Sequence, residues 1–401
     1  MMGNVKFHGA KLREALRFRG IRMADLARAT DISRQSLSLY ANDENRPSVD
    51  NMLKIAQYLD FPMEFFLNDD SCTVATSNTY FRSQAAARKK SQEAEKLKME
   101  YTAKLYETLL EYVNFPELNL PDTSDFKNLI PEPEKTDADS MAEIIEKLAL
   151  HVRDEWHLGL EPIDNMQYLL ASHGIIVVGF HNVDDKIDAF SQRINIKGHG
   201  VVYIIALAVG SKPMTRLYFD MAHELGHILM HHWDNTNETL SKQEFNNLER
   251  QANMFASAFL LPAKTFGNDV DVGLYAASLN YYRALKRRWK VSMQAMMYRA
   301  RELNIITGNQ FSYLMRQISA KGERKHEQGD TPGELEDSIF QGAIDVLLEG
   351  GYLTVKSLIN AFHEKGIYLS KRDMENLMGL KPETLKEVPS IIKFKPKVPS
   401  K

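Results

Sequence analysis

Two histidines and a glutamate in the middle of the chain have the residue types and the spacing of a hydrolytic metal site. They are His223, Glu224 and His227, in the run His-Glu-Leu-Gly-His. Residues four apart lie on one face of an α-helix, so His223 and His227 can hold one metal ion between them. Glu224 then lies close enough to act as a base on a water molecule without being a ligand. The pattern predicts zinc as the cofactor and hydrolysis as the chemistry.

A catalytic zinc ion takes three protein ligands, so the chain must supply a third. One known arrangement requires Gly at position 230 and His at position 233, but the chain has Met230 and Trp233 there. His231 is a poor third ligand, because a straight helix cannot place three consecutive turns around one ion. Glu249 is the better candidate. Asn253, about one helical turn later, could orient a ligand side chain through a hydrogen bond without binding the metal itself.

The elements that must position these residues can be predicted from the spacing of apolar residues. The two histidines belong to a helix expected at about Met214–His231, and the candidate glutamate opens another at about Glu249–Phe259. The small residues Ala252 and Ala256 would let the second helix pack closely against the first. Before these helices, three short β-branched runs predict a small three-stranded sheet. They are Gly174–Gly179, Ile187–Ser191 and Val201–Leu207.

The bulk composition is that of a soluble globular protein. With 401 residues, the chain is expected to form two or three domains. The formal net charge is −3, so any DNA binding must come from a local patch. The single cysteine, Cys72, excludes a disulfide framework and a cysteine-based zinc site. The sequence also has no apolar signal core and no run suited to crossing a membrane, so we expect a cytoplasmic protein.

Residues 8–67 predict a compact helical domain that contains a helix-turn-helix. The helices of that pair are expected at Met23–Thr30 and Arg34–Asn42, with Ser33 as the N-cap of the second. Ser48 is expected to cap a further helix. Three runs in this region resemble the lambda-repressor-like (XRE) family of DNA-binding domains. They are Ala24-Asp-Leu-Ala27, Ile32-Ser-Arg-Gln-Ser-Leu-Ser38 and Asn45-Arg-Pro-Ser48.

This resemblance implies a five-helix domain whose third helix enters the major groove of operator DNA. Arg34, Gln35 and Ser38 lie on the exposed side of that helix and are candidates for contacts with base edges or phosphates. Ser33, Tyr40 and Asn42 are candidates for contacts with the DNA backbone. The alternative is a helical interaction module that does not bind DNA.

The regions that flank the metal motif are also expected to be largely helical. Residues 71–139 predict a connector, with a long amphipathic helix at Gln84–Tyr112 followed by a proline-rich linker. Arg283–Leu303 has the basic character of a second helix-turn-helix, but a helical subdomain is the preferred interpretation. Residues 331–401 predict a helical C-terminal region whose role the sequence does not reveal.

A second resemblance covers roughly residues 140–330. Phe219–His231, with Leu248–Pro262, resembles the ImmA/IrrE family of metallopeptidases, and supporting matches are Asp188–Ser191 and Arg288–Ser292. The resemblance implies a zincin-like helical metallopeptidase domain with a small sheet. One position departs from the family pattern, because Ala206 stands where the family often has Asn at the end of a strand.

Carried over position by position, this resemblance implies His223, His227 and Glu249 as zinc ligands and Glu224 as the catalytic base. Peptide hydrolysis also needs a donor that stabilises the oxyanion. The sequence leaves several candidates for it: His231, His232, Arg250 and Tyr203.

The expected fold is therefore α+β and mostly α, with domains at residues 1–70, 140–330 and 331–401 and a connector at 71–139. The expected function is that of a homodimeric, DNA-binding transcription regulator with a zinc endopeptidase domain. As the family implies, its substrate would be a repressor or antitoxin protein, cut in response to a signal. One alternative is a DNA-binding repressor whose peptidase fold is a non-catalytic sensor or structural module. Another is a protease whose N-terminal domain recruits a protein partner.

Overall fold

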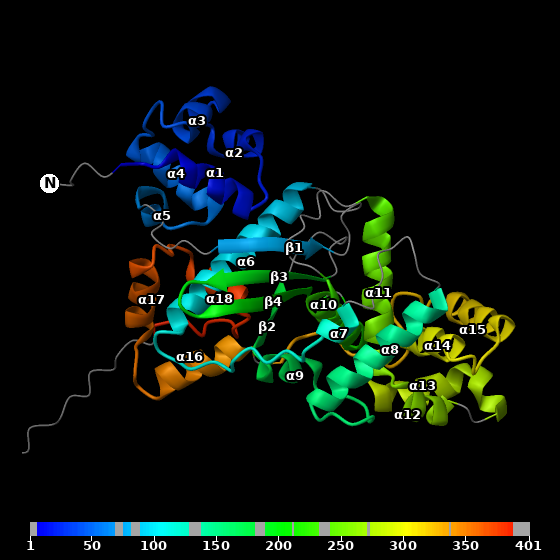
Figure 1. Ribbon diagram of the computed structural model, residues 1–401. Coiled ribbons are helices and arrows are strands. Elements are labelled where there is room, and N and C mark those ends of the chain that lie inside the picture. Colours follow the sequence, from blue (N-terminus) through cyan, green and yellow to red (C-terminus); the bar gives the residue numbers. More distant parts are fainter. Residues whose placement is uncertain are drawn as a thin grey trace, which may run out of the picture.

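The computed structural model describes residues 6–68, 75–81, 89–127, 138–180, 189–210, 212–231, 241–270, 273–336 and 338–387. The fold is α+β and mostly α, as predicted. Figure 1 shows a helical N-terminal domain at one end and a small sheet at the centre. Helices of the metal-motif region lie on one side of the sheet, and the C-terminal helices lie on the other. Among the described residues, none of the helices combines the length and the apolar character needed to cross a membrane.

The N-terminal domain has the five helices that the sequence predicts. They are α1 (Gly9–Phe18), α2 (Met23–Thr30), α3 (Arg34–Ala41), α4 (Val49–Leu59) and α5 (Met63–Leu67). The hydroxyl of Ser33 accepts a hydrogen bond from the Ser36 amide, so it caps α3 as predicted. Ser48 caps α4 in the same way, through the amide of Asn51. Leucines on the inner faces, including Leu12, form a buried core.

The sheet contains the three predicted strands and one that the sequence did not predict. Its order is β1-β3-β4-β2, with β1 at Ala75–Phe81, β2 at Ile175–Phe180, β3 at Ala189–Ile196 and β4 at Gly200–Ala208. β3 runs antiparallel to both β1 and β4, whereas β2 is parallel to β4. β3 also extends to Ile196, because Ile194 and Ile196 alternate with the more exposed Arg193 and Asn195. Residues 187 and 188 lie outside the described residues.

The helices that surround the metal motif share one hydrophobic core with one face of the sheet. Two of them carry the motif residues, α10 (Met214–Met230) and α11 (Lys242–Leu260). α11 begins earlier than predicted, because Ser241 and Glu244 form a capping box at its start. The others are α7 (Ser124–Lys127), α8 (Ala138–Glu155), α9 (Met166–Ser172), α12 (Ala263–Val270), the 3-10 helix η2 (Gly273–Ala277), α13 (Leu279–Trp289), α14 (Met293–Glu302) and α15 (Gly308–Ala320).

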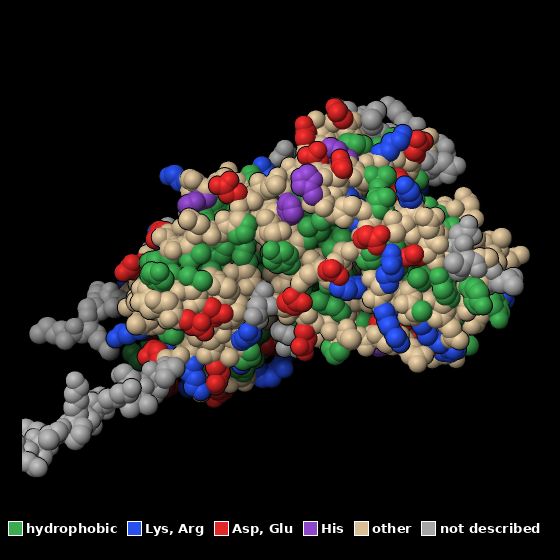
Figure 2. All heavy atoms as spheres, turned by 90° about the horizontal axis from the view of Figure 1, so that it is seen from below, with side chains coloured by type: hydrophobic (Ala, Val, Ile, Leu, Met, Phe, Trp, Pro, Cys, Tyr) green, Lys and Arg blue, Asp and Glu red, His purple; other side chains and the backbone are tan. Residues whose placement is uncertain are grey.

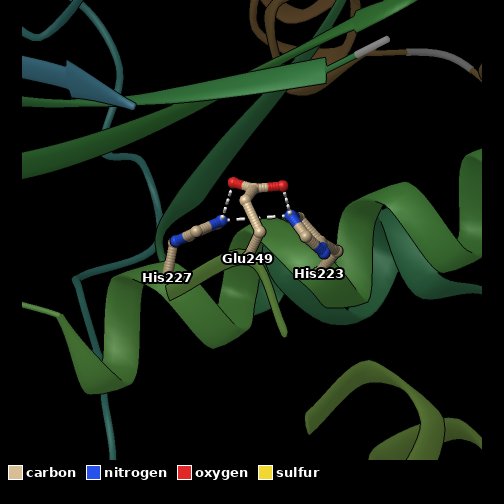
Figure 3. A group of neighbouring side chains, drawn as sticks. All are labelled: His223, His227 and Glu249. Atoms are coloured by element: carbon tan, nitrogen blue, oxygen red, sulfur yellow. Dashed lines mark hydrogen bonds and ion pairs between the residues drawn. The ribbon is translucent and has the colours of Figure 1, made fainter. Parts of the chain in front are cut away.

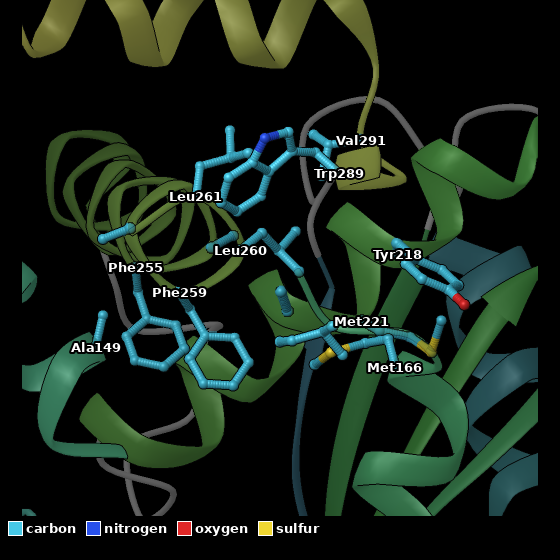
Figure 4. Packing of buried hydrophobic residues seen from close by; sticks show 14 of the residues in the cluster. Ala149, Met166, Tyr218, Met221, Phe255, Phe259, Leu260, Leu261, Trp289 and Val291 are labelled. Atoms are coloured by element: carbon cyan, nitrogen blue, oxygen red, sulfur yellow. The ribbon is translucent and has the colours of Figure 1, made fainter. Parts of the chain in front are cut away.

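Close packing between α10 and α11 depends on a glycine. A Cβ atom on Gly226 would lie 3.3 Å from the Cα atom of Ala252 and 3.1 Å from the ring of Phe255. The absence of a side chain at this position therefore lets the two helices approach each other. Figure 4 shows the layer beside this contact, in which Phe255 and Phe259 of α11 pack near Met221 of α10. This packing sets the position of α11 relative to the two histidines.

A second core joins parts of the chain that are far apart in the sequence. It contains the N-terminal helices, α6 (Lys89–Leu109), the opposite face of the sheet and three C-terminal helices. These are α16 (Ile339–Glu349), α17 (Val355–Glu364) and α18 (Lys371–Met378). The ring of Tyr101 on α6 lies 5.6 Å from that of Phe18 on α1. The apolar stripe predicted for the connector helix is therefore buried within the chain.

The C-terminal helices also contact the N-terminal domain through charged groups. Arg19, just after α1, donates two hydrogen bonds to the carboxylate of Asp373 on α18, at 2.6 and 2.5 Å. Arg19 also donates to the backbone carbonyl of Leu59. On the face shown in Figure 2, acidic and basic side chains are interspersed among apolar ones. Among the described residues this face carries no single-sign patch of the kind that attracts DNA.

Candidate metal centre

The three residues of the motif lie in the interior, where α10 crosses beneath the sheet. His223, Glu224 and His227 have exposed fractions of 0 to 1 %. α10 begins after Pro213, whose extended backbone conformation precedes the first helical residue. Burial of three ionisable side chains on one helix is costly unless each has a polar or charged partner. The surrounding contacts supply such partners.

Glu249 of α11 meets both histidines, as Figure 3 shows. The Nε2 atoms of His223 and His227 lie 3.0 Å apart. The Glu249 carboxylate lies 3.2 Å from Nε2 of His227 and 3.5 Å from Nε2 of His223. Three side chains from two helices thus converge on one point, and His231 is not one of them.

Hydrogen bonds behind the histidines set which ring nitrogen of each carries a proton. Nδ1 of His223 lies 3.1 Å from the amide oxygen of Asn253, which can only accept, so Nδ1 donates. His231 places Nε2 3.0 Å from the amide oxygen of Gln251 and Nδ1 2.8 Å from Nδ1 of His227. A neutral His231 therefore donates to Gln251 and accepts from His227. In the neutral state that binds a metal ion, both metal-motif histidines then direct an Nε2 lone pair toward the same point as Glu249.

Burial and hydrogen bonding shift the pKa values of His231 and Glu249. Burial of His231 lowers its pKa well below the usual value, which favours the neutral ring that the hydrogen bonds require. Burial alone would raise the pKa of Glu249, but in the metal-free protein hydrogen bonds donated by Nε2–H groups of His223 and His227 outweigh it and lower the pKa to about 2. The Glu249 side chain is 16 % exposed and carries a negative charge at neutral pH.

The donor set fits a zinc ion. Zinc bonds of about 2.0–2.1 Å in tetrahedral geometry separate neighbouring ligand atoms by about 3.3–3.4 Å. The separations of 3.0, 3.2 and 3.5 Å bracket that value. In addition, with both rings neutral, two nitrogen lone pairs and a carboxylate face one another, and a cation between them would satisfy all three. Two imidazoles with one carboxylate are typical of catalytic zinc sites.

Glu224 is held by a residue to which sequence reasoning assigned no role. Ser191 of β3 donates a hydrogen bond from its hydroxyl to Oε2 of Glu224, at 2.6 Å, and both side chains are buried. Ser191 belongs to the run Asp188–Ser191, which contributed to the family resemblance. The one available signal was a polar residue within a predicted strand, and in the structure Ser191 is fully buried there.

A cleft of about 710 Å³ opens beside Glu249. Its lining includes Arg216, Phe219, Arg250, Asn253, Met254 and Tyr298. Among the oxyanion candidates, Arg250 lies on this cleft, whereas His231 is buried behind His227. Tyr203 is a buried residue of β4, and His232 lies outside the described residues. The cleft therefore favours Arg250 for a contact with substrate.

The predicted DNA-contacting residues lie on and beside α3. Ser33, Arg34, Gln35, Ser38 and Asn42 are exposed. Tyr40 differs, because its side chain is 6 % exposed and its hydroxyl accepts a hydrogen bond from Asn51 at 3.2 Å. Its ring packs in the core of the domain, so Tyr40 has far less surface to offer DNA than the other five residues.

Two family models match the chain. The helix-turn-helix model covers residues 12–66, and the model of the IrrE N-terminal-like domain, a peptidase family, covers residues 172–301. These matches confirm the two resemblances seen in the sequence. The peptidase match contains β2, β3, β4, α10 and α11, and hence the whole metal centre. No curated protein matches the chain.

Proposed function

We propose that this chain, a helix-turn-helix domain fused to an IrrE-like peptidase domain, is a cytoplasmic DNA-binding transcription regulator that acts as a zinc endopeptidase. The observation that carries the proposal is the meeting of His223, His227 and Glu249, with Glu224 beside them on the same helix. The substrate is a repressor or antitoxin protein, cut at one or a few sites when a signal arrives. This substrate class rests on the resemblance alone.

His223, His227 and Glu249 would hold the zinc ion, and Asn253 and His231 would fix the orientation of the two imidazole rings. When bound, zinc polarises the scissile carbonyl and lowers the pKa of water to about 7. Glu224 takes a proton from the attacking water and returns it to the leaving amine nitrogen. Because Ser191 binds Oε2, the proton is carried by Oε1.

The roles that we propose for Arg250 and for the exposed residues of α3 follow from where these side chains lie. Arg250 lies on the cleft next to Glu249 and is suited to stabilise the oxyanion or to bind a substrate carbonyl. The exposed residues of α3, above all Arg34 and Gln35, would enter the major groove of an operator. A homodimer would match a two-fold symmetric operator, as is usual for this kind of reader.

The variant Glu224→Gln tests catalysis without removing a metal ligand. The full-length protein and this variant are expressed in the native host, and new protein N-termini are compared between the two strains. We expect one or a few new N-termini that depend on Glu224. The two proteins should contain equal amounts of zinc, and they should protect the DNA upstream of their own gene equally. An identical set of N-termini would defeat the peptidase proposal and favour a non-catalytic sensor.

DNA binding is tested separately with Arg34→Ala, which changes an exposed side chain of α3. The affinity of the protein for the DNA upstream of its own gene should fall, and that affinity should depend less steeply on the salt concentration. The exposed Arg28 of α2 provides a matched control, Arg28→Ala. Failure of the unmodified protein to bind any upstream fragment would favour recruitment of a protein partner by the N-terminal domain.

A further inference from the structure

The outer edge of β3 is covered by a strand from outside the peptidase domain. β2, β3 and β4 lie within the residues that match the peptidase family, and in that set β3 is the antiparallel edge strand. β1 pairs with this edge, but β1 comes from the connector, between α5 and α6. A part of the chain outside the residues that match the peptidase family therefore completes the sheet.

The covered edge lies beside the catalytic base. Ser191 of β3 binds Glu224 at 2.6 Å, and the Cα partner of Ser191 on β1 is Tyr80. Antiparallel partners have Cα atoms roughly 4.5–5.5 Å apart, so the β1 backbone passes within one strand spacing of Ser191. Any extended peptide that added to this edge would therefore run past the residue that holds Glu224.

We propose that the outer edge of β3 binds the scissile segment of the substrate as an added strand, and that β1 is an internal occupant that the substrate must displace. The inference rests on the proposed peptidase function and specifies how that site receives a protein chain. An exposed strand edge is a template for extended peptides, because its backbone groups pair with any sequence that adopts a strand.

Two features of β1 suit a displaceable occupant. The register shifts between Thr76 and Thr79, and such a bulge interrupts the ladder of hydrogen bonds. β1 is also attached through short segments to α5 of the N-terminal domain and to α6. A change in the position of the N-terminal domain would thus act on the strand that covers the edge.

The test weakens β1 pairing through its backbone. Backbone amides of a strand point alternately toward and away from the neighbour, so one of the variants Thr79→Pro and Tyr80→Pro must remove a donor to β3. Thr79→Val is the matched control, because it keeps the amide. All variants are full-length, zinc-loaded and carry Glu224→Gln, so a bound peptide is not cut.

The probe is a fluorescent synthetic peptide with the sequence of residues 73–83, and the reference is the same peptide with proline at positions 76, 78 and 80, which cannot pair as a strand. If β1 covers the edge in nine molecules of ten or more, one of the proline variants should bind the peptide at least about tenfold more tightly than the control. Equal affinity in all proteins would overturn occupancy by β1. Binding no better than that of the proline-containing peptide would overturn the strand-binding edge.

A second measurement uses no proline variant, so its result does not depend on whether the proline variants fold. In the Glu224→Gln protein, excess peptide should speed hydrogen exchange at residues 75–81 while residues 189–196 stay protected. Unchanged exchange at residues 75–81 at saturating peptide would count against displacement. Neither experiment requires proteolysis. If the peptide displaces β1 but Glu224 proves dispensable for new N-termini, the peptidase proposal fails and the strand-binding edge stands.

Discussion

Ser191 and Glu224 are joined by a hydrogen bond of 2.6 Å that links strand β3 of the sheet to α10, the helix that carries the two histidines of the motif. The donor is a neutral hydroxyl and the acceptor a buried carboxylate, so the bond orients the base without neutralising it. It also assigns different tasks to the two carboxylate oxygens. The first prediction follows from this division.

Ser191→Ala should lower kcat by about 10- to 100-fold, because a bond to a buried charged group contributes about 1.5–3 kcal/mol. KM should change little, since Ser191 holds the base and does not bind substrate. Ser191→Thr restores the hydroxyl and should recover most of the rate. Steady-state kinetics on the substrate identified by its new N-terminus measures both constants. A rise in KM with kcat unchanged would contradict a positioning role.

Glu249→Gln should reduce zinc affinity more than about 100-fold, because loss of a ligand should exceed the 10- to 100-fold effect of losing an orienting group. Glu244→Gln on the same helix is the control, since Glu244 is an exposed capping residue remote from the histidines. Competition with a fluorescent chelator gives both affinities. Equal affinities would exclude Glu249 as a ligand.

Asn253→Ala should weaken zinc binding by about 10- to 100-fold, because the His223 ring loses the acceptor that fixes its tautomer. Asn246→Ala is a matched control, as Asn246 lines the same cleft on the same helix. The chelator competition applies here too. An Asn253 variant that bound zinc as tightly as the control would show that the contact is dispensable.

The pKa of Glu249 predicts how the metal-free protein responds to acid. The folded protein lowers this pKa from its ordinary value near 4.5 to about 2, so the ionised form is favoured by folding. The stability that Glu249 contributes is full above about pH 5 and disappears as the pH falls toward 2. The free-energy difference between the unmodified protein and Glu249→Gln, from urea unfolding with chelator present, should shrink over that window. A constant difference would refute the assignment.

The Arg19–Asp373 pair should stabilise the contact between the N-terminal domain and α18. Its side chains are 18 % and 6 % exposed, so removal of one partner leaves a largely buried charge. Asp373→Ala should cost about 2–4 kcal/mol of unfolding free energy. Glu383→Ala, which removes an exposed ion pair with Lys386, should have no measurable effect. Urea unfolding compares the two, and equal stabilities would mean that the pair contributes nothing.

The parts of the site that follow from helical spacing could be predicted from the sequence. His223 and His227 share a face by their separation alone, and Asn253 lies one turn from Glu249 for the same reason. Ser191 could not be predicted, because its partner lies 33 positions away on a different element. The same holds for Gln251, which reaches His227 only through His231.

Strand β1 was not predicted from the sequence for a different reason. Residues 75–81 read Ala-Thr-Ser-Asn-Thr-Tyr-Phe, and Ser-Asn in the middle is typical of a turn. The segment becomes a strand through pairing with β3, which is a tertiary effect. The apolar stripe of the connector helix was visible in the sequence, but its burial against the C-terminal helices was not. Spacing shows that a face is apolar and does not identify what covers it.

The second core has a genetic consequence. Phe18, Tyr101, Phe340 and Phe362 belong to one apolar cluster, although they come from opposite ends of the chain. The helix-turn-helix domain is therefore packed against the rest of the chain and is not an independent domain on a flexible linker. An allele that stops translation before α16 would keep every candidate DNA-contacting residue and every candidate metal ligand, yet it would expose the apolar side of α1 and α6 to water. Late nonsense alleles should thus resemble deletions of the gene.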